Sequence, residues 1–250
     1  MPSSPLTIRY PISSMTATEL FQTGKVRDAV SSLTASVRSN PADRKSRTFL
    51  FELLCFSGQY DRAAKQLAVL GEGSKENELG AVMYYSALHA EKARHDLFRT
   101  QEFPKLAAAP SPAGKWNGTP FESIVDCDPQ IGARLEVYAA GAYIWIPFHH
   151  ISTIEVQPTK QLRDTLWTQA FVMTGPSFKG TDIGEVIIPA IYPFSWNSPD
   201  ESLWLGRDTD WVADDEGNEF PVGHKTFLID GKEVPLVEIR SIEFASNAAA

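Results

Sequence analysis

The chain carries four polar side chains whose types could support acid–base catalysis. Asp126 and Asp128 stand on either side of Cys127, and His149 and His150 follow them in the sequence. Carboxylates and imidazoles are groups that commonly transfer protons in enzymes. One hypothesis is therefore a hydrolase-like site between domains that uses Asp126, Asp128 and either histidine. Since adjacent residues of a strand point to opposite faces, the two histidines are poorly placed to share a metal ion.

An acidic run extends over residues 208–219. A calcium-binding loop needs oxygen ligands at alternating positions, a central glycine and a closing glutamate. Asp208 and Asp210 begin such a pattern, but Trp211 interrupts it and Gly217 comes too late. We interpret the run as a solvated acidic loop.

Familiar catalytic motifs are missing from the sequence. It contains no glycine-rich phosphate loop, no Gly-x-Ser-x-Gly turn and no zinc-protease spacing. His89 and His95 lie six residues apart in a predicted helix, which does not place them on one face, and we expect both to be exposed. We predict that the protein is not an enzyme and has no catalytic residue, cofactor or metal ion.

Two tryptophan-ended motifs, 162–167 and 205–211, each contain an adjacent Arg-Asp pair. Arginine and tryptophan dominate binding hot spots, but arginine–carboxylate pairs also fix loops within a fold. We favour the structural interpretation, in which these pairs hold loops on a sheet; crosswise bonds between the two motifs are one way to do so. Partner contact and catalysis are the alternatives. The residues concerned are Arg163, Asp164, Arg207 and Asp208.

Composition limits the class of protein. The 250-residue chain is 43% hydrophobic with a net charge of −8, which argues against general nucleic-acid binding. Residues 1–110 contain 14 Lys+Arg and 11 Asp+Glu, against 9 and 20 in residues 111–250, so the two regions differ in character. Two cysteines make no disulfide framework, and no secretory or membrane-spanning segment is visible. We expect a cytoplasmic protein without membrane insertion.

The first region has the hydrophobic spacing of amphipathic helices. A 34-residue repeat aligns Gly24 with Gly58 and Leu33 with Leu67, which is the tetratricopeptide period. Two repeats are fewer than the ~3 usually needed for independent stability, so we expect them to pack on the second region. The predicted helices are 16–22, 25–38, 44–56, 60–70 and 76–98.

After residue 110 the hydrophobic pattern changes from helical to alternating. Alternation predicts strands, and Asp230-Gly231 predicts a hairpin turn that joins the last two of them. We expect an antiparallel or mixed sheet, with residues 159–168 and 236–244 either helical or extended. The predicted strands are 134–138, 143–148, 151–156, 170–173, 185–188, 227–229 and 234–237.

These patterns define a fold class and a domain organisation. We predict an α+β protein in which N-terminal tetratricopeptide-like repeats pack on a C-terminal β-rich domain. Proline, glycine and alanine concentrate in one stretch that marks the boundary. The expected parts are a flexible N-terminus (1–15), a helical domain (16–103), a linker (104–120) and a β-rich domain (121–246).

The order and spacing of these motifs resemble the ImpE/TagJ (SciE-type) family of type VI secretion system accessory proteins. The Gly24 and Gly58 turns belong to the resemblance, whereas the segment after Trp211 continues past the last family motif. The other residues that carry it are 117–121, 126–128, 135–137, 143–148, 162–167, 189–193 and 205–211.

The resemblance implies a non-enzymatic adaptor. Such proteins are understood to bind the N-terminal amphipathic helix of the small contractile-sheath subunit and to act beside the AAA+ ATPase that recycles sheaths. We expect an indirect relation to that ATPase, and the sequence leaves a homodimer open. A helix laid in an apolar groove would contact exposed aromatic residues. The expected contacts are Trp145, Phe148, Trp167, Tyr192, Trp196 and Trp211.

Overall fold

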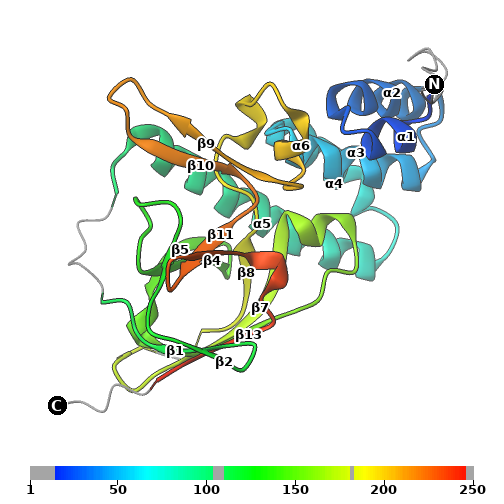
Figure 1. Cartoon of the computed structure of the whole chain (residues 1–250). Helices are drawn as coiled ribbons and strands as arrows, with labels where there is room; N and C mark the ends of the chain where they lie inside the picture. Colours follow the sequence, from blue (N-terminus) through cyan, green and yellow to red (C-terminus); the bar gives the residue numbers. More distant parts are fainter. Residues whose placement is uncertain (1–14, 104–109, 181–182, 246–250) are drawn as a thin grey trace, which may run out of the picture.

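The computed structural model describes residues 15–103, 110–180 and 183–245. This part of the chain is α+β, with helices first and sheets after them (Figure 1). The N-terminus expected to be flexible lies, up to residue 14, outside the described residues, as do residues 104–109 of the expected linker. The first helices are α1 (Ala17–Gln22), α2 (Val26–Ser39), α3 (Arg44–Phe56), α4 (Tyr60–Leu70) and α5 (Lys75–Thr100).

The predicted helix ranges agree with the structure to within two residues. Side-chain caps mark the starts of three of these helices, α1, α3 and α5. Thr16 and Glu19 form a capping box at the start of α1. The side chain of Asp43 accepts hydrogen bonds from two backbone N–H groups at the start of α3, and that of Ser74 accepts one, from Asn77, at the start of α5. These side chains satisfy donors that a helix start leaves unpaired.

The 34-residue spacing places equivalent residues in equivalent environments. Gly24 and Gly58 follow α1 and α3 with φ of 77° and 68°, a conformation that favours glycine. Ala29 and Ala63 are both fully buried. A Cβ atom on Gly58 would lie 2.4 Å from Cε2 of Trp196, so this turn also lets the second part of the chain approach closely.

An eight-stranded antiparallel sheet dominates the second part of the chain. Its strand order is β2-β1-β13-β6-β7-β8-β4-β5. The two-residue turn Asn117-Gly118 joins β1 to β2, inside the range expected to be a linker. The strands are β1 (Gly114–Trp116), β2 (Thr119–Phe121), β4 (Arg134–Ala139), β5 (Ala142–Pro147), β6 (Ile151–Val156), β7 (Trp167–Thr174), β8 (Gly184–Pro189) and β13 (Ser241–Phe244).

Two smaller sheets and several short helices complete the described fold. One sheet contains β3 (Ile124–Asp126), β11 (Thr226–Ile229) and β12 (Lys232–Pro235), and the predicted turn at Asp230-Gly231 is confirmed between β11 and β12. The other is a hairpin of β9 (Thr209–Ala213) and β10 (Glu219–Gly223). The short helices are η2 (Phe148–His150), η3 (Leu162–Thr165), η4 (Ser195–Asn197), α6 (Glu201–Trp204) and η5 (Leu236–Glu238).

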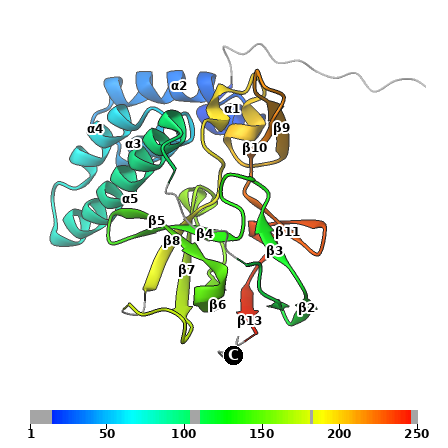
Figure 2. The same ribbon diagram turned by 90° about the vertical axis from the view of Figure 1, so that its left-hand side faces the viewer.

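Two apolar clusters hold these layers together. One joins the helices to residues of the second part, including Tyr138 and Trp167. The other lies within the β-rich part and includes Val172 and Phe227. Helix α5 packs on β5 and β4, and this contact joins the helical region to the sheet (Figure 2). Among the described helices, none is long and apolar enough to cross a membrane.

Candidate functional site

A buried polar network lies between α5 and the sheet. Asp126 contacts Lys225 (Oδ2 to Nζ, 2.6 Å), and Lys225 contacts Glu136 (Nζ to Oε1, 2.7 Å). Glu136 in turn binds Arg94 of α5 through two hydrogen bonds of 2.6 and 2.8 Å. Arg94 also contacts Glu91, and all five residues are at most 3% exposed. Buried charges are tolerated when they are paired in this way.

Aromatic side chains supply further hydrogen bonds to the network. The Tyr138 hydroxyl and the Trp167 indole N–H donate to Glu91 over 2.7 and 2.8 Å. The Tyr192 hydroxyl donates to Asp126 over 2.9 Å. Because an unpaired carboxylate is costly in a low dielectric, these donors help to keep the buried charges in place.

The carboxyl groups in and beside the network differ in pKa. Burial alone would raise the pKa of Glu136, but the charges of Arg94 and Lys225 hold it at about 2. Burial and the charge of Asp126 raise the pKa of Asp128 to about 7. Glu136 is therefore ionised at neutral pH, whereas Asp128 titrates there. Such shifts occur in catalytic sites and also in structural ion-pair networks.

The hypothetical hydrolase-like site is not assembled in the described residues. Asp126 is engaged by the network, and Asp128 accepts the backbone N–H of Gln130. His149 and His150 pack beside each other with ring centroids 4.0 Å apart. Within the described residues, no hydrogen bond, ion pair or ring contact joins either histidine to either aspartate.

The acidic run forms the β9–β10 hairpin and its neighbouring turns. Asp214 caps its own turn by accepting the N–H groups of Glu216 and Asn218. Within the residues that the structure describes, no group of three or more His, Cys, Asp or Glu side chains is placed to hold a metal ion.

The two Arg-Asp motifs do not bond to each other. Arg163 binds Glu52 of α3 (2.8 Å) and the hydroxyl of Tyr84 in α5. Arg207 instead donates to the carbonyls of Phe21 and Gln22 at the end of α1. Both arginines therefore connect the second part of the chain to the helices, one by an ion pair and one by capping. Cations suit the carbonyl end of a helix.

The aspartates of these motifs act locally. Asp164 accepts the backbone N–H groups of Lys160 and Gln161, and Asp208 accepts that of Thr209. Neither forms an ion pair among the described residues. In each motif the arginine thus binds a helix of the first region, whereas the aspartate binds backbone N–H groups close to it in the sequence.

Three of the six aromatic residues expected to contact a partner are buried. Phe148 belongs to the core within the β-rich part, and Trp167 and Tyr192 serve the polar network. They are 0–2% exposed. In this arrangement they offer no surface to a partner.

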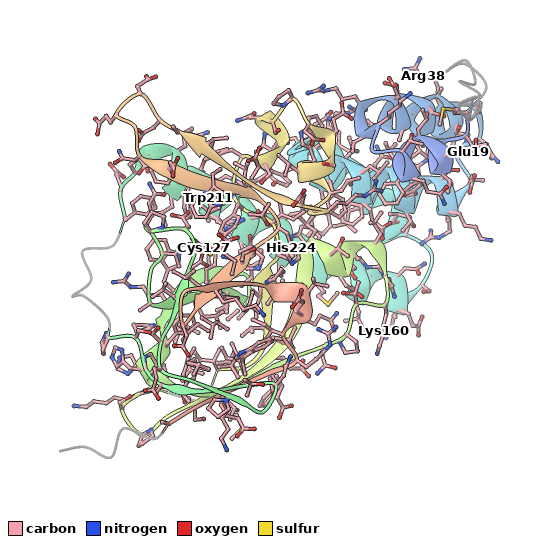
Figure 3. The ribbon with its side chains drawn as sticks, viewed as in Figure 1. Glu19, Arg38, Cys127, Lys160, Trp211 and His224 are labelled. Atoms are coloured by element: carbon pink, nitrogen blue, oxygen red, sulfur yellow. The ribbon has the colours of Figure 1, made fainter. Side chains whose placement is uncertain are left out.

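The other three differ in exposure. Trp145 stacks on Phe103 beyond the end of α5, and Trp196 packs edge-on against Tyr60. Both are only partly exposed. Trp211 lies on the β9–β10 hairpin and is 39% exposed (Figure 3). It is the member of the expected set with the most accessible ring.

Exposed apolar side chains gather on the first half of α5 and on β7. Leu79 is 71% exposed and Val82 57%, and Met83 follows with 42%. On β7, Phe171 and Met173 are 40% and 47% exposed. Apolar side chains gathered in this way mark binding surfaces more often than scattered ones do.

A groove of about 640 Å³ lies between α5 and strands β4, β7 and β8. We name it the α5–sheet groove. Its α5 wall includes Met83 and Ala87, and its sheet side includes Tyr138, Phe171 and Ile187. Clefts between packed elements with a predominantly apolar lining are common ligand sites.

Comparison with known proteins places the chain in a family. The model of the ImpE protein family matches residues 118–243, which is half of the chain. This chain belongs to the ImpE family. The match continues well beyond Trp211, the last family motif expected from the sequence.

Two further comparisons cover nearly the whole chain. The type VI secretion system accessory component TagJ of Pseudomonas aeruginosa (strain PAO1) is 29% identical over 94% of this chain and 93% of its own length. The crystal structure of protein VPA1032 from Vibrio parahaemolyticus has a TM-score of 0.80 at 21% identity, over 93% of this chain and 98% of that one. The second likeness shows a shared fold.

The residues matched to the ImpE model contain the sheet side of the network and of the groove. Asp126, Glu136 and Lys225 lie within 118–243, whereas Glu91 and Arg94 come from α5, outside it. Both features are therefore built at the junction between the matched residues and the preceding helices.

Sequence reasoning missed the central residues of the network. Glu136 sits in a strand and Lys225 precedes one, where single charged residues give no clear signal. Glu91 and Arg94 lie three apart, among buried alanines of one helical face, and this placement was the available clue. The expectation that His95 is exposed is wrong: it is 7% exposed, and its Nε2 lies 2.9 Å from Tyr60 Oη.

Proposed function

We propose that this ImpE protein is a non-enzymatic accessory component of a type VI secretion system. The relation to TagJ over nearly the whole chain supports that role. The distribution of side chains supports binding rather than catalysis. Asp126 and Asp128 are buried in or beside ion pairs, while the exposed apolar residues flank an open groove.

The partner in this proposal is the N-terminal amphipathic helix of the small contractile-sheath subunit. The α5–sheet groove carries the proposal, because Met83 and Phe171 present large apolar side chains at its rim. An amphipathic helix recognises such a groove by inserting residues at i, i+3, i+4 and i+7. The repeats of α1–α4, which we take to be tetratricopeptide-like, would support the α5 wall.

The cellular role follows from this partner. We propose that the protein works in the cytoplasm, where it assists or modulates sheath recycling by an AAA+ ATPase that it reaches through the sheath subunit. The net charge of −8 disfavours nucleic acid as a partner. A homodimer formed through the same groove would compete with the sheath helix.

Peptide titration tests the proposal. The N-terminal peptide of the small sheath subunit from the same bacterium should bind with a Kd of about 1–100 μM, measured by calorimetry. Phe171→Asp should weaken binding at least tenfold, since it places a charge in the apolar contact. Leu228→Asp is the matched control, because Leu228 is 36% exposed on β11 and does not line the groove. No binding up to ~1 mM would refute the proposal.

A further inference from the structure

The exposed Phe171 lies between two glutamates of the neighbouring strands. On one side it is paired across the ladder with Glu155 of β6, and on the other with Glu185 of β8. Directly paired residues project from the same face of a sheet. All three side chains are exposed, so the apolar ring has a carboxylate on each side.

Neither glutamate has a basic partner within the part of the chain that the structure describes. No ion pair or side-chain hydrogen bond of Glu155 or Glu185 occurs there. Glu185 is also the one charged residue in the described lining of the α5–sheet groove. Two carboxylates thus stand beside Phe171 without an ion pair among the described residues.

The spacing of the two carboxylates matches the width of a helix. Neighbouring strands lie about 4.8 Å apart, so β6 and β8 are separated by roughly 10 Å across β7. An α-helix with its side chains is about 10–12 Å wide. A helix that lies along β7 would place its apolar stripe on Phe171 and Met173. Its two flanks would then stand over Glu155 and Glu185.

From this geometry we infer that the α5–sheet groove selects a helix whose apolar stripe has basic residues along both edges. The inference rests on the proposed helix-binding function and specifies the chemistry of the partner. Lysine or arginine beside the stripe would meet the glutamates, whereas acidic residues there would be repelled. Long basic side chains also suit a rim position, because their stems cover apolar surface while their charges stay in water.

Two model helices test the charge requirement without the sheath subunit. Both have ~18 residues and the same leucine stripe, but one carries lysine along both edges and the other glutamate. Binding is measured by fluorescence anisotropy on the full chain in low salt. We expect the lysine helix to bind at least tenfold more tightly. Raising the salt to ~0.5 M should reduce this difference, because exposed charges are then screened.

Variants of the protein test whether Glu155 and Glu185 cause the preference for the lysine helix. The double change Glu155→Gln with Glu185→Gln should weaken binding of the lysine helix about 2- to 30-fold, the range for two exposed charge pairs. Glu219→Gln is the matched control, because Glu219 is exposed on β10 and does not line the groove. Phe171→Asp should abolish binding of the leucine stripe. Circular dichroism would check that each variant keeps the fold of the parent.

The outcomes separate the inference from the proposed function. Equal binding of the two model helices, or an unchanged affinity in the double variant, overturns the inference. If the sheath peptide binds through Phe171 but ignores Glu155 and Glu185, the inference also fails while the proposed function stands. If the lysine helix needs both glutamates and the sheath peptide does not bind, the proposed function fails instead. A dimer that Phe171→Asp converts to monomers would show that a second copy fills the groove, which also overturns the inference.

Discussion

The two halves of α5 reverse the usual distribution of charged and apolar residues. Its second half buries Glu91 and Arg94 at 2% and 1% exposure, and its first half exposes Leu79 and Val82 at 71% and 57%. Charged side chains are rarely buried unless they are paired, and a contiguous exposed apolar patch is equally unusual. The same helix thus contains buried charged residues in one half and exposed apolar residues in the other.

This difference in burial indicates that the second half of α5 anchors the helix, whereas the first half remains accessible. Buried ion pairs contribute little net stability compared with apolar packing, but breaking one is strongly destabilising. The second half of α5 thus fixes the helix in one position on the sheet, through Glu136 and the ring of Trp167. The first half has no such constraint on its outer face. It is held at a defined angle beside the sheet while its apolar residues remain accessible.

The largest expected effect comes from breaking the buried half. Arg94→Ala removes the cation that lies between Glu91 and Glu136 and leaves Glu136 with Lys225 alone. It should lower the free energy of unfolding by about 3–5 kcal/mol. Arg99→Ala on the same helix is the control, because Arg99 is 69% exposed and should change stability by no more than ~0.5 kcal/mol. Urea denaturation followed by circular dichroism measures both.

A second variant tests charge pairing at this position even if Arg94→Ala fails to fold. Replacing Arg94 and Glu136 together by methionine removes both charges and should restore part of the loss. A double variant no more stable than the single one would contradict a role for charge pairing at this position.

The two tryptophan-ended motifs allow a similar comparison in the second part of the chain. Trp167→Ala removes a buried ring and the N–H that binds Glu91, and should cost about 3–5 kcal/mol. Trp211→Ala should cost less than ~1 kcal/mol, because that ring is 39% exposed. Melting temperatures under identical conditions would show the contrast. Equal losses would mean that the hairpin ring is as important to the fold as the buried one.

Much of the fold could be predicted from the sequence because local signals specify it. Helix ends were set by caps such as Thr16 with Glu19, and the Asp230-Gly231 turn by the need for positive φ. The Asn117-Gly118 turn carries the same signal. The proline and alanine residues around it nevertheless favour a linker in the sequence.

The network and groove could not be predicted in the same way. Lys225 and Glu136 are 89 positions apart in the sequence, and only the register of long-range strands brings them together. The exposure of Phe171 depends on how far α5 extends over the sheet, which no local pattern encodes. Long-range pairing therefore explains why the elements were predictable and the site was not.

A pH titration tests Asp128, which follows β3 and lies beside the network that anchors the second half of α5. The folded-state pKa of Asp128 is raised from 3.8 to about 7, so the folded protein keeps a proton that the unfolded chain loses earlier. Stability contributed by this group is complete below pH ~4 and is lost as pH rises to ~7, by up to about 1.4 kcal/mol per pH unit. Asp128→Asn should remove that loss.

Comparing the pH dependence of stability in Asp128→Asn and in the parent separates the effect of Asp128 from that of other titrating groups. The pKa of His224 is lowered to about 4 by burial and by Lys225, which makes stability rise over part of the same range. The difference in unfolding free energy between Asp128→Asn and the parent should therefore be followed from pH 5 to 8. It should increase up to pH ~7 and then level off. A difference that does not change with pH would contradict the raised pKa.

The smallest expected effect concerns the exposed half. Leu79→Gln combined with Val82→Gln should change the free energy of unfolding by less than ~0.5 kcal/mol, because both side chains already face solvent and glutamine is a good helix former. Neutrality in urea denaturation would show that the fold does not need these two apolar side chains, as expected for residues of an exposed binding surface. A loss of more than ~1.5 kcal/mol would mean that the first half of α5 is part of the core after all, and the contrast between its two halves would disappear.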